Sequence, residues 1–402
     1  MKVVIFKPHH DIWFRNPVRR ILKKEVIPSK YALLLDHLIA SDARVYFSTR
    51  LFFGVGLRGW CRNIFDAFHL LAWAVINRLD LSRVRFVFTP SGLRDKDVVI
   101  FMHYGSFTAE DESGAKACRE LADCFKDLDI FKIVHMTHYA YCSKIGAANL
   151  ELLSPDMLVA ENDLRKNSPF FMRNFKGVSG EFYHLPFVAA LRFQRREGFS
   201  RRTNRLGVTG SITYKMKDSD FLRYFGQDEL QPMRRKIYER QAELSSLIDS
   251  FIYDLDEARQ KESALTSSDD LDVTRAQAAA KQRNYYNADI VEFFNSYRMF
   301  AVPEEVCDLP GISFIEGMAC GAAYFGLDNP MYRDIGMVPG VHYVAYDGTL
   351  EHLLERVAYY QQHADELEQI AEQGYQIAHT TLSSTSVYSK FLASLERMLP
   401  RP

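Results

Sequence analysis

Short β-rich apolar runs alternate with helical patterns along this 402-residue chain, and they form two separate series. Such alternation is typical of parallel α/β sheets, in which a helix connects each strand to the next. The first series predicts strands at residues 3–6, 44–47, 85–88, 98–102, 131–135 and 157–160. The second predicts strands at residues 204–211, 299–303, 322–326 and 342–346. We therefore expect two doubly wound α/β domains.

A polar, arginine-rich stretch, RFQRREGFSRRTNR, separates the two series at residues 192–205 and has no apolar period. This composition is typical of a linker. We place the first domain at residues 1–195 and the second at residues 196–380. Residues 228–285 of the second domain predict a helical insertion with no convincing strand, so either a strand is hidden there or the sheet is small.

Charge and cysteine usage narrow the class of protein. The 50 basic and 51 acidic residues give a net charge of −1, so the chain as a whole has no electrostatic reason to coat nucleic acid. The six cysteines contain no CxxC pair and suggest neither a zinc site nor a disulfide framework. Met1 and Lys2 lead directly into a predicted strand. We expect a cytoplasmic protein.

The stretch DLPGISFIEGMACG, residues 308–321, follows the strand predicted at 299–303. Open α/β sheets bind ligands at the carboxyl ends of their strands, where this stretch begins. A helix that starts at about Gly311 would direct its free N–H groups toward such a ligand and favour phosphate oxygens. Glycine at position 311 would let the backbone approach the anion closely.

Glu316 falls on this predicted helix among Phe314, Ile315 and Met318. A carboxylate in apolar surroundings must find hydrogen-bond partners. The hydroxyls of a bound ribose are suitable partners, and donors from a neighbouring loop are an equal alternative.

These residues carry a resemblance. Asp308, seven intervening residues, Glu316 and the sequence GMACGAA resemble the Glu-x7-Glu segment and small-residue helix end of the group 1 family of retaining, nucleotide-sugar glycosyltransferases, although the first acid here is Asp. The resemblance is most specific over residues 299–357. It implies the GT-B fold, with two Rossmann-like domains facing a central crevice. It also implies that the helix expected at residues 381–402 crosses back to the first domain.

The resemblance also implies a function. The protein would move a sugar from a nucleotide-sugar donor to a glycan or lipid-linked acceptor, with retention of configuration, in bacterial surface polysaccharide synthesis. Asp308 would face the transferred sugar. Donor contacts are expected from Gly210, Ser211, Lys215, Lys217, Pro310, Gly311, Ile312 and Glu316.

One donor contact departs from the family pattern. Ser211 stands where many members carry a phosphate-binding arginine, so Lys215 or Lys217 is expected to supply that charge, with Arg234 and Arg235 as further candidates. No metal is expected, because cations and helix N–H groups can stabilise the leaving diphosphate.

The first domain is expected to bind the acceptor through side chains at its strand ends. His138 and Glu161 are the catalytic candidates there, since a histidine can bind sugar or move a proton near neutral pH. The acceptor-binding candidates are His9, His10, His103 and Tyr139.

The basic stretch from Arg15 to Lys24 includes apolar Val18, Ile21 and Leu22, a pattern that could rest on anionic lipid headgroups at the inner face of a membrane. Two other functions stay open. One is a nucleotide-sugar epimerase, and the other is a non-catalytic glycan-binding relative, which the departures at Asp308 and Ser211 motivate.

Overall fold

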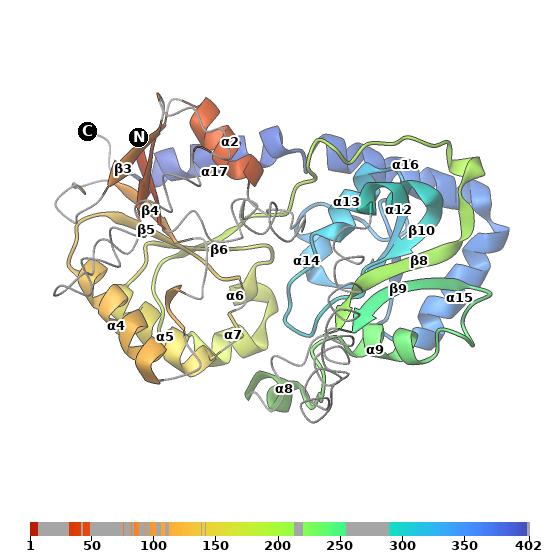
Figure 1. The fold of residues 1–402 in the computed structure, drawn as a ribbon, viewed down its shortest axis with the longest axis horizontal. Coiled ribbons are helices and arrows are strands. Elements are labelled where there is room, and N and C mark those ends of the chain that lie inside the picture. The colour runs from red at the N-terminus through yellow and green to blue at the C-terminus, as the bar shows by residue number, and fades with distance from the viewer. Residues whose placement is uncertain are drawn as a thin grey trace, which may run out of the picture. The chain divides into compact units, whose positions relative to one another are not determined.

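The structure is a computed structural model. It describes residues 1–6, 32–41, 43–48, 75, 82, 84–87, 93, 97–101, 106–108, 112–137, 139–140, 142–212, 220–254 and 289–399. The chain divides into two compact units (Figure 1): Met1–Leu185 with Tyr388–Pro402 form one, and Pro186–Val387 form the other.

The first unit is built on a parallel sheet that contains seven strands within the described residues, in the order β3-β2-β1-β4-β5-β6-β7. The strands are β1 (Lys2–Phe6), β2 (Arg44–Ser48), β3 (Val84–Val87), β4 (Val98–Phe101), β5 (Phe131–His135), β6 (Met157–Ala160) and β7 (Glu181–His184). The order reverses between β1 and β4, as in doubly wound folds. The six predicted strands are confirmed to within one residue at each end.

The described helices of this unit are α2 (Ala32–Ala40), α4 (Glu112–Lys126), α5 (Ser143–Leu153), α6 (Leu164–Asn167) and α7 (Pro169–Asn174). The helix α17 (Ser384–Met398) reaches this unit as well, since the chain from Tyr388 onward clusters with it. The Phe391 ring lies 5.2 Å from that of Tyr183 on β7, and the Tyr388 ring lies 6.0 Å from that of His37 on α2.

Strand β7 is missing from the sequence prediction. It has four residues, EFYH, none of them fully buried, and it pairs with β6 at one edge of the sheet as far as the structure describes it. An edge strand that is partly open to solvent needs no continuous apolar run, so its sequence carries little strand signal.

The second unit has five parallel strands in its described part, in the order β12-β11-β10-β8-β9. They are β8 (Thr203–Ile212), β9 (Ile248–Asp254), β10 (Tyr297–Ala301), β11 (Ala323–Leu327) and β12 (Val344–Tyr346). The second strand along the chain lies on one side of the first and the third lies on the other. This is the flavodoxin-like order, in which β8 and β10 form the topological switch point.

The described helices of the second unit are α8 (Asp220–Phe225), α9 (Pro232–Glu239), α12 (Ile290–Ser296), α13 (Ser313–Ala319), α14 (Pro330–Arg333), α15 (Leu350–Gln362) and α16 (Ala364–His379). None of the helices in the described part of the chain has the length and apolarity that crossing a membrane requires.

Strand β9 is the hidden strand that the sequence left as one alternative for residues 228–285, and it corrects the purely helical interpretation of that segment. The helix α9 lies there, but residues 248–254 pair in register with β8, from Leu206 opposite Ile248 to Ile212 opposite Asp254. Leu247, Ile248, Phe251 and Ile252 have helical spacing, which explains the wrong prediction. Pairing with β8 overrides that local pattern. Residues 255–285 lie outside the described residues.

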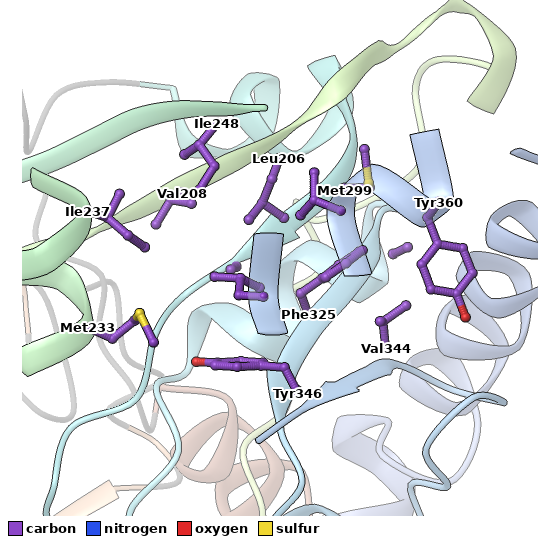
Figure 2. Close-up of a cluster of buried hydrophobic side chains, with 14 of the residues drawn as sticks. Leu206, Val208, Met233, Ile237, Ile248, Met299, Phe325, Val344, Tyr346 and Tyr360 are labelled. Atoms are coloured by element: carbon purple, nitrogen blue, oxygen red, sulfur yellow. The ribbon is translucent and has the colours of Figure 1, made fainter. Parts of the chain in front are cut away.

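The core of the second unit lies between its sheet and the helices α9, α15 and α16 (Figure 2). Apolar side chains of all five strands meet there; those labelled in the figure are Leu206, Val208, Met233, Ile237, Ile248, Met299, Phe325, Val344, Tyr346 and Tyr360. On α13, a Cβ at Gly317 would lie 2.3 Å from the Phe300 ring of β10. Only glycine permits this approach of helix to strand.

The stretch interpreted as a linker is packed into the second unit. Arg202 is buried, and its guanidinium donates to the carbonyl oxygens of Glu197 (2.9 Å) and Cys320 (2.8 Å). Burial, with a smaller effect of the Arg195 charge, lowers the pKa of Arg202 to about 10. Arg195 pairs with Glu372 at 2.6 Å. Arg195 and Arg202 therefore make contacts within the second unit, and the linker interpretation is wrong for these two residues.

Candidate active site

The switch point of the second sheet brings together the carboxyl ends of β8 and β10. Gly210 and Ser211 lie at the end of β8, and residues 302–312 connect β10 to α13. Open α/β sheets bind ligands at this place, and it holds the described residues that the sequence assigns to the donor.

Asp308 lies in this connection in a strained conformation. Its φ is 54°, in the left-handed region. That conformation costs a non-glycine residue roughly 1–2 kcal/mol and is least unfavourable for Asp and Asn. The N-cap of α13 is Ile312, so Asp308 does not cap this helix. Strain of this kind concentrates at functional sites.

Cys307, beside Asp308, is a buried thiol. Burial raises its pKa well above the usual value, and the charges of Glu305 and Asp308 add to the shift. The thiolate that a nucleophilic role would need is therefore disfavoured.

The helix that follows starts slightly later than expected. Phe314 N–H donates to Gly311 O at 3.1 Å and Ile315 N–H to Ile312 O at 3.2 Å, so a tight turn precedes α13, which begins at Ser313. Pro310 is buried, whereas Gly311 and Ile312 are half-buried. A Cβ at Gly311 would meet no described atom closer than Val302 Cγ1, at 3.4 Å. Internal packing therefore does not require glycine at this position.

Glu316 is buried within α13, and its Oε2 accepts a hydrogen bond from Ser313 Oγ at 3.1 Å. Serine at the first helical position thus provides one partner from within the same helix.

Arg234 of α9 connects the two strand ends. Its Nε donates to Pro303 O at 2.8 Å and its Nη1 to Ser211 O at 2.9 Å, with Glu305 Oε1 at 3.7 Å from Nη1. The residue is only 6% exposed, yet its Nη2 donates to no described residue. A Cβ at Gly210 would lie 2.8 Å from Arg234 Nε, so glycine makes room for the guanidinium. A buried cation with an unused donor thus lies beside Ser211.

Two acids directly after β10 are residues that the sequence analysis missed. Glu305 accepts from Gln231 Nε2 at 2.8 Å, and Glu304 is buried and bonded to tyrosine hydroxyls at 2.6–3.3 Å. Their position in the sequence could have revealed them, because acidic residues that follow a buried strand usually belong to a binding site or to a hydrogen-bond network.

In the first unit, Glu161 is buried and lies beside the buried side chain of His135. His135 Nδ1 accepts from Thr137 N–H at 3.1 Å, so its proton lies on Nε2, which faces Glu161 Oε1 at 3.3 Å. Both side chains come from the carboxyl ends of β5 and β6.

Tyr139 is a core residue. It is fully buried, its hydroxyl bonds to Ser168 Oγ at 2.9 Å, and its ring packs against Phe171 at 5.6 Å and Phe175 at 6.0 Å. A glycan cannot reach it in this structure, because aromatic side chains of α7 and the residue after it cover the ring. The other predicted site residues, His9, His10, His103, His138, Lys215 and Lys217, lie outside the described residues.

A cavity of about 330 Å³ lies elsewhere, lined by Gly340, Val341, Tyr360, Glu366, Gln369, Ile370 and Gln373. The first two residues precede β12, so the cavity is at the amino edge of the sheet. It is remote from the switch point and takes no part in the candidate site.

Comparison with known proteins supports the class. Residues 236–393 match a family described as glycosyl transferase-like. No curated protein sequence matches the chain. Among solved structures, the chain is similar to the Anabaena protein Alr3699/HepE in complex with UDP, with a TM-score of 0.52, 11% identity, and coverage of 99% of this chain and 100% of that chain.

Two further solved structures are similar. Sucrose-phosphate synthase from Thermosynechococcus elongatus has a TM-score of 0.55 and 9% identity, with 99% of each chain covered. An alpha-glucosyltransferase in complex with UDP and a 13-mer DNA has a TM-score of 0.50 and 12% identity, with 98% of this chain and 99% of that chain covered. The expected GT-B fold is thereby confirmed. The family match over residues 236–393 supports a glycosyltransferase.

Proposed function

We propose that the protein transfers a sugar from a uridine diphosphate sugar to a glycan or lipid-linked acceptor, in bacterial surface polysaccharide synthesis, with retention of configuration and without a metal. The observation that carries the proposal is Arg234, a buried cation at the switch point whose Nη2 donates to none of the described residues, next to the loop of Asp308. UDP is chosen because the similar Anabaena protein was solved with it.

The roles follow from charge. Arg234, with Lys215 or Lys217, neutralises the donor diphosphate as the glycosidic bond breaks and negative charge accumulates on the leaving group. The backbone from Pro310 to Ile312 approaches the phosphates beside Gly210 and Ser211, and Glu316 accepts from ribose hydroxyls. Asp308 faces the sugar, and Glu161 with His138 serves the acceptor side together with His9, His10 and His103.

A panel of nucleotide sugars tests the proposal. Incubation of the protein with each donor is expected to give slow hydrolysis of one UDP-sugar, accelerated by a glycan or polyprenyl-linked acceptor. Epimerised donor without release of UDP would instead identify an epimerase. No turnover with every donor, together with no UDP binding by calorimetry, would leave a glycan-binding relative.

Gly311→Ala separates ligand approach from packing. Gly311 does not have a positive φ, and a Cβ there would have room. Alanine should therefore leave the melting temperature unchanged or raise it slightly. If the phosphates contact this backbone, the added methyl group should weaken UDP binding about tenfold, measured by calorimetry. Unchanged affinity in the folded variant would remove residue 311 from the donor site.

We also propose that the stretch from Arg15 to Lys24 binds anionic bilayers, which would suit a lipid-linked acceptor. Its clustered positive charge is the motivation. Co-sedimentation with phosphatidylglycerol vesicles should decline with salt and fall when Arg19, Arg20, Lys23 and Lys24 are replaced by Gln. Wild type that stays in the supernatant at low salt would contradict the idea.

A further inference from the structure

The carboxylate of Glu304 collects hydrogen-bond donors from three neighbouring elements. Its Oε1 accepts from the hydroxyl of Tyr332 at 2.6 Å, the hydroxyl of Tyr324 at 2.8 Å and the N–H of Leu327 at 3.1 Å. Its Oε2 accepts from the hydroxyl of Tyr346 at 3.3 Å. Four donors match the acceptor capacity of one ionised carboxylate.

This network is buried, and its three tyrosine hydroxyls stay protonated. Glu304 and its three tyrosines are all buried. Burial, followed by the charge of Glu304, raises the pKa values of Tyr324, Tyr332 and Tyr346 well above 10. The hydroxyls therefore remain hydrogen-bond donors throughout the neutral range.

The network joins the donor-site loop to the rest of the sheet. Tyr324 belongs to β11, Tyr332 to α14 and Tyr346 to β12, whereas Glu304 begins the connection that leads through Asp308 to α13. One side chain thus ties this connection to three elements that follow it in the chain.

The residues on either side of Glu304 contact α9. The carbonyl oxygen of Pro303 accepts from Arg234 Nε at 2.8 Å, and Glu305 Oε1 accepts from Gln231 Nε2 at 2.8 Å. A rotation of the backbone at Glu304 would displace both contacts. The orientation of Glu304 therefore bears on the position of the buried arginine as well as on Asp308.

We propose that Glu304 is a positioning residue for sugar transfer. By accepting from the three tyrosine hydroxyls, it fixes the connection at residues 303–312 so that the carboxylate of Asp308 is held where transfer needs it. This inference rests on the function proposed above for the same site. In this proposal Glu304 acts through Asp308 and not by contact with the substrate.

Two substitutions and a matched control test it. Glu304→Gln replaces one acceptor oxygen by a donor, and Tyr332→Phe removes the shortest hydrogen bond. Tyr343→Phe makes the same change on a buried ring 5.4 Å from that of Tyr332, but this hydroxyl bonds to Leu327 O at 3.3 Å and not to Glu304. Tyr332→Phe and Tyr343→Phe each remove one tyrosine hydroxyl and its hydrogen bond, so Tyr343→Phe is the matched control for stability.

With the donor found in the panel, Glu304→Gln and Tyr332→Phe should lower kcat about tenfold or more while KM for the donor changes less than about threefold. Tyr343→Phe should keep kcat within about twofold. Wild-type kcat in Glu304→Gln, or an equal fall in Tyr343→Phe, would overturn the proposal.

Hydrogen exchange gives a readout that needs no activity. Amides of residues 304–312 should exchange about tenfold faster in Glu304→Gln, or in the milder Tyr332→Phe if the first variant does not fold, while Tyr343→Phe exchanges like wild type. If wild type transfers no sugar from any donor, the proposed function fails, and this measurement alone decides the positioning. Unchanged exchange of this segment would overturn it.

Discussion

Asp308→Asn is expected to lower turnover about 10²-fold or more while affinity for free UDP changes less than about threefold. The carboxylate can accept hydrogen bonds from hydroxyls of the transferred sugar or offset the positive charge of an oxocarbenium-like transition state. Free UDP lacks the transferred sugar, so its affinity should not depend on either role. Asparagine tolerates the left-handed φ of 54° as aspartate does, so the backbone should not move. Initial rates and calorimetry with UDP measure the two quantities.

Asp308→Gly is the matched control, because it removes the carboxylate and also relieves the left-handed strain. It should be at least as stable as wild type in thermal unfolding and as inactive as Asp308→Asn. A rate near that of wild type in either variant would show that Asp308 is a loop residue without a catalytic role.

Arg234→Met is expected to weaken UDP binding about 10- to 100-fold, the effect of losing a charge-assisted hydrogen bond of roughly 1.5–3 kcal/mol. Uridine, which lacks the phosphates, should bind wild type and variant alike. The reason is the unused Nη2 of a guanidinium that is already held by Pro303 and Ser211. Calorimetry measures the affinities of UDP and uridine for each protein, so the two ligands are compared within wild type and within the variant.

The neighbouring arginine provides the control for stability. Arg235 pairs with Glu229 at 2.9 Å and with Asp254 at 2.6 Å, so Arg235→Met should lower the melting temperature without a selective loss of UDP over uridine. Equal weakening of UDP and uridine by Arg234→Met would mean that Arg234 only joins β8 to β10 and does not contact phosphate.

Much of the fold could be predicted from the sequence because parallel strands are covered on both faces. Runs such as Val3, Val4 and Ile5 are buried and apolar throughout, which a single sequence displays. Strand β7 has no buried residue and the apolar residues of β9 have helical spacing, so neither displays that signal.

The candidate site could be predicted only in part. Asp308 and Glu316 were found because they are eight positions apart on one short segment. Arg234 stood among several possible cations, and only folding set its guanidinium beside Ser211, 23 positions away in the chain. Tyr139 shows the opposite case, since a polar residue near a strand end is buried by the rings of Phe171 and Phe175.

The sequence by itself determined the α/β class, the two series of strands and the acidic segment after β10, because periodicity and spacing are local properties. Tertiary structure alone decided which polar groups meet. The carboxylate of Glu304 receives Tyr324, Tyr332 and Tyr346 from positions 20, 28 and 42 residues further along. Buried polar groups must be satisfied by whatever the fold brings near, and a sequence does not reveal those long-range partners.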